Sequence, residues 1–390
     1  MIKLEKAIEL AIENAIKYPA EKISLDNTPG KVLAEDIVSD TDMPPFNKSA
    51  MDGFACRKGD ISSSLEIIET IPAGRLPEKK IQPGTCSRIM TGAPVPDGAD
   101  CVIMVEYTEE VGKDRIRFTG EMIHHNICFR GEDIKKGDVL LRKGLIIGSA
   151  EIAVMASAGY SRVSVSRQPV VGIAATGNEL YPPGQELPEG AIRDSNSHQL
   201  QAQVRETGLK TINRGIVKDT REEISSVLAE LGKKTDVILL TGGVSVGDFD
   251  LVPEQLEKAG YRKIFHKVAI KPGMPLWFGL KNGIYCFGLP GNPVSTFVQF
   301  EYVIKPFLYA LMGAEFKSLI IEMPLLKEVK RKKSDRDSII PVRVLKDGVS
   351  PIEYHGSAHI NAIPEAEGFI MLRAGTTHLK KGEKIDVRLL

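Results

Sequence analysis

From residue 169 onward, short apolar runs alternate with helical stretches, and this alternation restricts the fold more than any other feature of the chain. The runs VVGIAATG, KTINRGIV and DVILLTGG are typical of buried strands, and SHQLQAQVRETG, TREEISSVLAELG and LVPEQLEKAG have the apolar spacing of helices. Strands that alternate with helices of this length form a parallel sheet with helices on both faces. The sequence therefore predicts a three-layer α/β domain with a parallel-rich sheet over residues 169–315.

The segments around this domain have other patterns. Residues 43–133 contain short β-rich runs between Gly/Pro turns, such as SLEIIETI, CSRIM and RIRFTG, which predict a small inserted β-rich domain. Residues 1–42 begin with an amphipathic helix, and residues 134–168 are expected to return and pack on that helix. Residues 316–390, with runs such as SLIIEMPLL and KIDVRLL, predict a C-terminal β domain. A chain of 390 residues is long enough for several such domains.

Composition and charge exclude several classes of protein. Lysine plus arginine equals aspartate plus glutamate at 51 each, so no net field attracts nucleic acid or an anionic membrane. No apolar run reaches the roughly 20 residues of a membrane span, and the N-terminus lacks the pattern of a signal peptide. The five cysteines are scattered without a C-x-x-C pair, which argues against a zinc site and favours a reducing compartment. We expect a cytoplasmic protein.

Glycine and polar residues follow the first three predicted strands of the α/β domain. Ligands bind outside the carboxyl ends of strands in such sheets, where a glycine-rich turn exposes N–H groups to phosphate and carboxylates can hold Mg²⁺. TGNEL could instead be an ordinary turn, and Asp219 could merely cap the next helix; TGGVSVGDFD is richer in glycine and acid than a simple connection requires. The candidates at this edge are Thr176, Gly177, Glu179, Asp219, Gly242, Gly243, Ser245, Gly247, Asp248 and Asp250.

Further candidates lie in five other motifs and at Lys267, four residues before Lys271. AIKPGMP contributes a lysine and two prolines, although its lysine could be a solvated surface charge, and LPGNPVS could be a rigid connector before a helix. In the β-rich domain, PPFNKSAMDGFA contains an aspartate in a turn that is either structural or functional, and RIMTGAPVPDGAD and GEDI follow it. The residues concerned are Asp52, Thr91, Asp133, Lys267, Lys271, Pro272, Pro275, Pro290, Gly291, Asn292, Pro293 and Ser295.

Taken together and in this order, PPFNKSAMDGFA, RIMTGAPVPDGAD, FRGEDI, ATGNEL, TGGVSVGDFD, AIKPGMP and LPGNPVS closely resemble the MoeA family, which includes the gephyrin E domain. The resemblance implies four domains: residues 1–42 with 134–168, residues 43–133, a MoaB/Mog-like domain over residues 169–315, and a β-barrel-like domain over residues 316–390. It also implies a homodimer whose cleft lies between the second domain of one subunit and the third and fourth of the other.

The family reaction is the Mg²⁺-dependent insertion of molybdate into adenylyl-molybdopterin, which yields molybdenum cofactor and AMP. By resemblance, the catalytic residues are Asp52, Thr91, Asp133, Lys267 and Lys271, and the metal ligands are Glu179, Asp219 and Asp250. By the same resemblance, the substrate is bound by Thr176, Gly177, Glu179, Gly242, Gly243, Ser245, Gly247, Asp248, Pro272, Pro275, Pro290, Gly291, Asn292, Pro293 and Ser295. A molybdopterin adenylyltransferase is the partner that this chemistry implies.

Two alternatives keep the same fold. A paralogue could use tungstate in place of molybdate, and a non-catalytic scaffold like gephyrin could bind a protein partner through the same domains. Retention of the acidic residues favours catalysis over the scaffold. The sequence departs from the family pattern at Cys128 and Met274, and the C-terminal domain follows it loosely, with Arg343 and Ser357 as its candidates.

Overall fold

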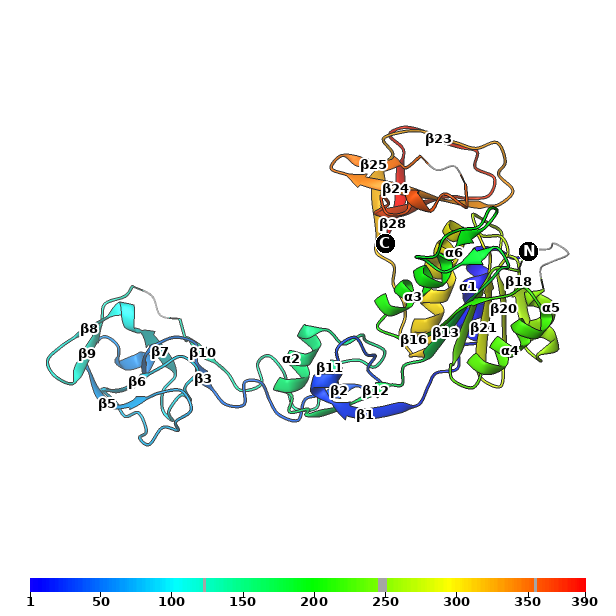
Figure 1. Ribbon diagram of the computed structural model, residues 1–390. Coiled ribbons are helices and arrows are strands. Elements are labelled where there is room, and N and C mark those ends of the chain that lie inside the picture. Colours follow the sequence, from blue (N-terminus) through cyan, green and yellow to red (C-terminus); the bar gives the residue numbers. More distant parts are fainter. Residues whose placement is uncertain (122–123, 245–250, 354–355) are drawn as a thin grey trace. The chain divides into compact units, whose positions relative to one another are not determined.

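The computed structural model describes residues 1–121, 124–244, 251–353 and 356–390 (Figure 1). Contacts divide the chain into two compact units. The first comprises residues 1–35, 143–149 and 162–390, and the second comprises residues 36–142 and 150–161. Each unit is described by itself, and the finer division into four domains stays a prediction.

The centre of the first unit is a six-stranded sheet in the order β16-β13-β17-β21-β20-β18. The first four strands are mutually parallel and β20 runs antiparallel to both of its neighbours, which confirms the predicted parallel-rich sheet. The strands are β13 (Val170–Thr176), β16 (Lys210–Val217), β17 (Val237–Thr241), β18 (Arg262–His266), β20 (Trp277–Lys281) and β21 (Ile284–Leu289).

Helices cover both faces of this sheet, as predicted. Along β17, Val237 and Leu239 point into one core while Ile238 and Leu240 point into the other, because successive side chains of a strand alternate between its faces. One face is covered by α3 (Asn196–Glu206), α6 (Pro293–Gln299) and α7 (Lys305–Leu311), with π-helical residues Phe300–Ile304 joining the last two. The other face is covered by α4 (Arg221–Leu231) and α5 (Val252–Lys258).

The predicted hairpin before α6 is also present. β20 and β21 pair directly, and Asn282 and Gly283 at the tip have φ angles of 51° and 80°. Positive φ at both central residues is the requirement of a type I′ turn, which explains the Asn-Gly pair.

The N-terminal helix α1 (Leu4–Glu13) belongs to the core of the α/β domain. Its buried residues Leu4, Ala7 and Ala11 share that core, where the helix contacts α7 and the π-helical segment. The expectation that residues 134–168 pack on this helix was therefore wrong. They pair with strands instead: β12 (Arg162–Ser166) with β1 (Ala20–Ser24), and, within the second unit, β11 (Val139–Leu141) with β2 (Ile37–Val38). Helix α2 (Ser149–Ser157) lies between β11 and β12 in the chain.

The C-terminal residues form a barrel-like β domain. Its main sheet has the order β19-β24-β26-β28-β22, β25 pairs with β24, and a bridge between Leu325 and Val349 links the end of β22 back to β25. A closed ring of strands leaves few unpaired edges. The strands are β19 (Ile270–Lys271), β22 (Ile320–Pro324), β23 (Val329–Lys330), β24 (Asp337–Leu345), β25 (Gly348–Pro351), β26 (Gly368–Leu372), β27 (His378–Leu379) and β28 (Lys384–Leu389).

The second unit contains the predicted β-rich domain. Its six-stranded sheet has the order β7-β4-β6-β5-β9-β8, and a short pair of β3 and β10 lies beside it. The strands are β3 (Lys48–Ser49), β4 (Gly53–Cys56), β5 (Leu65–Ile71), β6 (Thr85–Ile89), β7 (Cys101–Met104), β8 (Thr108–Glu110), β9 (Arg115–Phe118) and β10 (Ile127–Cys128).

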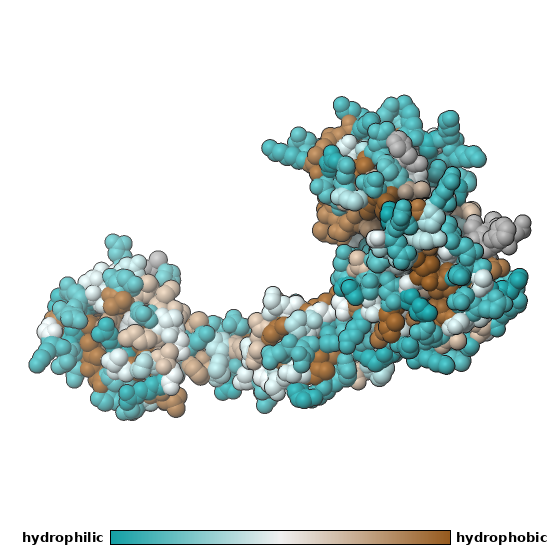
Figure 2. Space-filling model, viewed as in Figure 1, coloured by the Kyte–Doolittle hydropathy of each residue, from teal (hydrophilic) through white to brown (hydrophobic). Residues whose placement is uncertain are grey.

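The surface is mostly polar. On the face drawn in Figure 2, hydrophilic residues predominate and apolar residues occur in small groups. Within the described ranges, none of the helices has the length and apolar character needed to cross a membrane.

Candidate functional site

A cavity of about 590 Å³ lies at the carboxyl edge of the sheet in the first unit. Turns that follow β13, β17 and β21 line it from one side, and residues of the C-terminal β domain, Arg336, Gly356 and Ser357, line it from the other. This is the edge where an open α/β sheet binds its ligands. The predicted site residues that line the cavity are Glu179, Gly243, Lys271, Pro272, Pro275, Pro290, Gly291, Asn292 and Ser295.

Buried side chains hold the loop of residues 290–293 in place. The hydroxyls of Thr241 and Thr296 donate to the Pro290 carbonyl at 3.0 and 2.7 Å, and the Asn196 amide donates to the Gly291 carbonyl at 2.8 Å. Helix α6 begins directly after this loop, and Ser295 in its first turn is only 2% exposed. The loop is therefore a preformed wall of the cavity.

The turn that follows Lys271 is held from the same helix. The Gln299 amide donates to the carbonyls of Gly273 and Pro275 at 2.6 and 2.7 Å. Gly273 has a φ of +98°, and a Cβ added there would lie 3.1 Å from Gln299, so this position favours glycine. Lys271 itself is exposed at the cavity, in the short strand β19 that pairs with β24.

The glycine turn after β17 meets the ends of β13 and β16. A Cβ added to Gly242 would lie 2.2 Å from the Thr176 carbonyl oxygen, and one added to Gly243 would lie 3.1 Å from Thr176 Oγ1 and 3.5 Å from Asp219 Oδ1. Only glycine allows this approach. Among the described residues, the buried Thr176 hydroxyl has no hydrogen-bond partner.

The two described carboxylates of the predicted metal site belong to neighbouring loops at this edge of the sheet. Glu179 lines the cavity, and both of its carboxylate oxygens lie 2.9 Å from the position of a Cβ on Gly177. The backbone N–H of Asp219 donates to the Asn178 side chain at 3.2 Å, which ties the two loops together. Thr220, not Asp219, caps helix α4 by accepting from the Glu223 N–H, so the interpretation of Asp219 as the helix cap was wrong.

Ser245, Gly247, Asp248 and Asp250 lie outside the described residues. Several of the described candidates do not line the cavity. Lys267 is half-buried and its N–H donates to the Leu276 carbonyl at 3.1 Å. Pro293 occupies the first position of α6, and Thr176, Gly177 and Gly242 are not among the lining residues. Met274 is likewise absent from the lining, although its neighbours Gly273 and Pro275 belong to it. No group of three potential metal-binding His, Cys, Asp or Glu side chains occurs in the part of the chain that the structure describes.

The second unit holds a separate arrangement around Asp52. Its Oδ1 accepts hydrogen bonds from both the backbone N–H and the hydroxyl of Thr91, each at 2.7 Å. These two bonds, the backbone one first, hold the pKa of the Asp52 carboxyl below its usual value, so the exposed group is a carboxylate. Asp133 lies in another loop of this unit, where its N–H donates to the Met43 carbonyl.

Family models cover most of the chain. The MoeA N-terminal region (domain I and II) matches residues 2–159, a probable molybdopterin binding domain matches residues 172–310, and the MoeA C-terminal region (domain IV) matches residues 324–390. The chain belongs to the MoeA family.

Relatives and solved structures agree with this assignment to the MoeA family. The molybdopterin molybdenumtransferase of Staphylococcus epidermidis is 37% identical over all of this chain and 95% of its own length. That of Bacillus subtilis is 35% identical over 99% of this chain and 95% of its own. The crystal structure of the molybdopterin biosynthesis MoeA protein from Pyrococcus horikoshii OT3 covers 100% of both chains with a TM-score of 0.87 and 29% identity.

Three residues of this MoeA-family site were missed in the sequence. Arg336 precedes β24 in the basic run KRKKSDR, a signal that could have been noticed. Gln299 and Asn196 are amides on helices, and their roles depend on contacts between distant parts of the chain. Of the two C-terminal candidates, Ser357 lines the cavity, whereas Arg343 forms an ion pair with Glu365.

Proposed function

We propose that this MoeA-family chain is a molybdopterin molybdenumtransferase, which inserts molybdate into adenylyl-molybdopterin and releases AMP and molybdenum cofactor. The observation that carries the proposal is the cavity at the carboxyl edge of the sheet, where a lysine, an arginine and glycine turns come together. The names of the Staphylococcus epidermidis and Bacillus subtilis relatives favour this activity over a non-catalytic scaffold.

The cavity has the donors that an oxyanion needs. Lys271 and Arg336 supply two cationic groups, and Ser295 and Ser357 supply hydroxyls. Charge-assisted hydrogen bonds from such groups bind compact dianions without water. Lys271 and Arg336 also border a second cavity of about 550 Å³, which is lined by further basic residues of the C-terminal domain. We assign the molybdate subsite to the Lys271 and Arg336 side of the cavity.

The opposite side suits the diphosphate of the adenylylated substrate. Gly243 and Gly291 expose backbone at the cavity, which Glu179 also lines, and the Asp219 carboxylate borders the glycine turn at Gly243. Carboxylate oxygens are ligands that Mg²⁺ accepts, and Asp250 is the third candidate ligand. Bound Mg²⁺ would neutralise charge on the phosphate oxygens when a P–O bond of the diphosphate is cleaved.

We assign Asp52, Thr91 and Asp133 of the second unit to catalysis, together with Lys267 and Lys271 of the first unit. The hydrogen bonds from Thr91 fix Asp52 as an oriented carboxylate in a turn that carries little core packing. We further propose a homodimer in which the β-rich domain of one subunit completes the cleft of the other. A cytoplasmic location and delivery of the substrate by a molybdopterin adenylyltransferase complete the proposal.

The decisive experiment measures the release of AMP from adenylyl-molybdopterin by the purified protein. Molybdate and tungstate are compared, each in the presence of Mg²⁺ and after Mg²⁺ has been removed with EDTA. We expect turnover that needs both molybdate and Mg²⁺. A folded protein that releases no AMP would support the scaffold, and faster turnover with tungstate would support the paralogue. Sedimentation of the same preparation tests the homodimer.

A further inference from the structure

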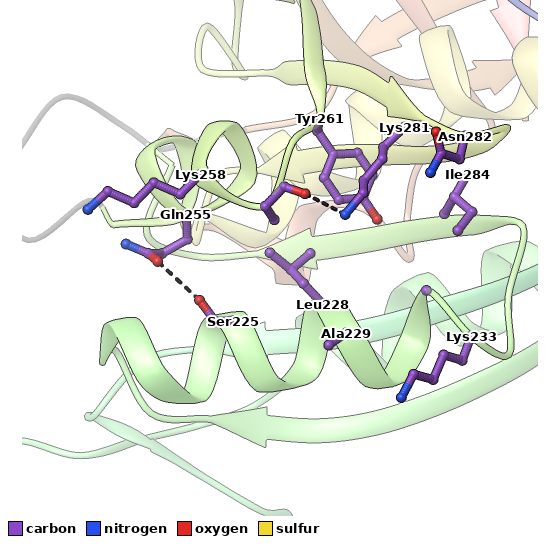
Figure 3. Close-up of a pocket in the computed structure, with 12 residues that line it drawn as sticks. Ser225, Leu228, Ala229, Lys233, Gln255, Lys258, Tyr261, Lys281, Asn282 and Ile284 are labelled. Carbon is purple, nitrogen blue, oxygen red and sulfur yellow. Dashed lines mark hydrogen bonds between the residues drawn. The ribbon is translucent and has the colours of Figure 1, made fainter.

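A second groove lies at the other end of the α/β domain, and nothing in the proposed transferase reaction uses it (Figure 3). It has a volume of about 580 Å³ and lies between α4, α5 and the turn that joins β20 to β21. Lys233 follows the end of α4, and Asn282 precedes the start of β21. Because α4 runs opposite to the parallel strands, both residues mark the amino edge of the sheet, whereas the candidate site lies at the carboxyl edge.

Two buried side chains, Gln255 and Tyr261, place polar groups at this groove. Gln255 is 3% exposed; its Oε1 accepts a hydrogen bond from Ser225 at 3.1 Å, whereas its Nε2 has no partner among the described residues. Tyr261 is 5% exposed, and its hydroxyl lies 3.8 Å from the position of a Cβ on Gly232, which also lines the groove. Burial raises the pKa of Tyr261, so its hydroxyl is a protonated donor. Buried donors without acceptors cost free energy, which a ligand that accepts hydrogen bonds would recover.

The charged residues that line the groove are lysines. Its lining includes three lysines and, among the described residues, no aspartate or glutamate. Lys258 pairs with Glu254 at 2.5 Å, and the Lys281 ammonium donates to the Ala259 carbonyl at 2.6 Å. Lys233 is exposed at the rim and makes no side-chain hydrogen bond or ion pair with the described residues. It is therefore the lysine that remains available to an anionic ligand.

Apolar side chains form part of the lining. Leu228 and Ala229 on α4 face Ile284 on β21 across the groove, and the Tyr261 ring lies beside them (Figure 3). A volume between roughly 300 and 1,000 Å³, apolar walls and a few placed polar groups are typical of a site for a small organic molecule.

We propose that this groove is a binding site for a small aromatic carboxylic acid, with the ring between the apolar walls and the carboxylate between Lys233 and the Tyr261 hydroxyl. The site is separate from the transferase cavity, so it does not depend on the proposed activity. An aromatic carboxylic acid is neither a substrate nor a product of the proposed transferase reaction.

The probe for this proposal is 2-naphthoate, titrated into the full-length protein and followed by saturation-transfer NMR and calorimetry. We expect saturable binding that Lys233→Gln weakens by about fivefold or more, because a charge-assisted contact is lost. Tyr261→Phe, which removes only the hydroxyl, should also weaken it. The matched control is Lys234→Gln, since Lys234 is the next residue, pairs with Glu230 and lies outside the groove. The control should bind like wild type.

Two comparison ligands test the carboxylate. The neutral 2-naphthalenemethanol should bind at least about fivefold more weakly than 2-naphthoate, because it cannot pair with Lys233. 2-Naphthyl phosphate distinguishes a preference for carboxylate from a general preference for anions, and its tighter binding would overturn the carboxylate assignment. Equal affinity of the acid and the alcohol, equal effects of Lys233→Gln and Lys234→Gln, or no saturable binding to wild type would each overturn the proposal. AMP release should be unchanged in Lys233→Gln.

Discussion

The amide of Gln299 donates a 2.6 Å hydrogen bond to the carbonyl of Gly273, and a second bond to Pro275 completes a clamp on the turn that follows Lys271. The clamp connects helix α6 to the turn, and α6 also begins at the loop of residues 290–293. Two walls of the candidate cavity are therefore held by one helix. Loss of the clamp should change both the stability of the domain and the position of Lys271.

We predict that Gln299→Leu lowers the free energy of unfolding by about 1–3 kcal/mol, because two carbonyls lose their donor in a buried place. It should also raise the molybdate concentration needed for half-maximal AMP release. Urea unfolding and a molybdate titration measure the two effects. Gln201→Leu is the control. Gln201 lies on α3, and its side-chain amide donates to the Thr211 hydroxyl of β16 at 3.2 Å. Equal molybdate requirements in both variants would contradict the positioning role of Gln299.

A second prediction concerns Asp52. Asp52→Asn keeps the Oδ1 atom that accepts both bonds from Thr91, so its free energy of unfolding should stay within about 0.5 kcal/mol of wild type. The charge is lost, and most AMP release should be lost with it. Unfolding and turnover are measured on the same preparation. Turnover close to wild type would remove Asp52 from the catalytic residues.

The environment of Asp52 gives a third prediction. Thr91→Val removes the hydroxyl donor but keeps the backbone N–H donor, which is the larger cause of the lowered pKa. The pKa of Asp52 should therefore rise toward its usual value without reaching it. An NMR titration of the Asp52 side-chain carboxyl measures this shift. Thr85→Val, whose hydroxyl bonds to Gln82, is the control and should leave the Asp52 titration unchanged.

Much of the site was predictable because its residues stand next to strand ends. Glycines and carboxylates directly after an apolar run must lie at the carboxyl edge of a parallel sheet, and Glu179, Gly243 and Asn292 do so. The residues that hold these loops were not predictable in this way. Asn196 reaches Gly291 across 95 positions of sequence, and no local pattern indicates such a contact.

The error about helix α1 has a related cause. Its apolar spacing predicts one buried face of Leu4, Ala7, Ile8, Ala11, Ile12 and Ala15. Leu4, Ala7 and Ala11 are buried, whereas Ile12 is 42% exposed, and an apolar face does not specify what it packs against. In the structure that partner is the core of the α/β domain. The prediction named residues 134–168 as the partner of this helix. Part of that segment, β12, does return to the N-terminal segment, but it pairs with β1.

His266 leads to a prediction about pH. Burial, more than the neighbouring lysines, lowers the pKa of this half-buried histidine below 6.5, although its ring is hydrogen-bonded to the Val244 carbonyl at 3.0 Å. The unfolded chain therefore binds the proton first, and stability is lost as pH falls from above 6.5 through the lower pKa of the folded state. Urea unfolding at about pH 8 and about pH 5.5 should show a smaller loss on acidification for His266→Asn than for wild type. Equal losses of stability in the two proteins would mean that groups other than His266 cause the loss on acidification.

The last prediction concerns Arg331, which lies next to the proposed oxyanion subsite but acts through another residue. Its guanidinium donates to the Arg336 carbonyl, the Ser338 hydroxyl and the Thr376 carbonyl, each at 2.6 Å. This fork fixes the backbone from which the Arg336 side chain reaches the cavity. Lysine keeps the charge but cannot form the fork.

Arg331→Lys should therefore raise the half-saturating molybdate concentration by about tenfold, as expected for the loss of roughly 1.4 kcal/mol of binding free energy, with kcat at saturating molybdate changed less. Lys333→Gln is the control, because Lys333 lines the same basic cavity without contacting Arg336 in any described hydrogen bond. A double-mutant cycle decides the mechanism. If Arg331 acts by positioning Arg336, adding Arg331→Lys to Arg336→Gln should have little further effect on molybdate binding, since the two changes remove the same interaction. Fully additive losses would show instead that Arg331 contacts the oxyanion on its own.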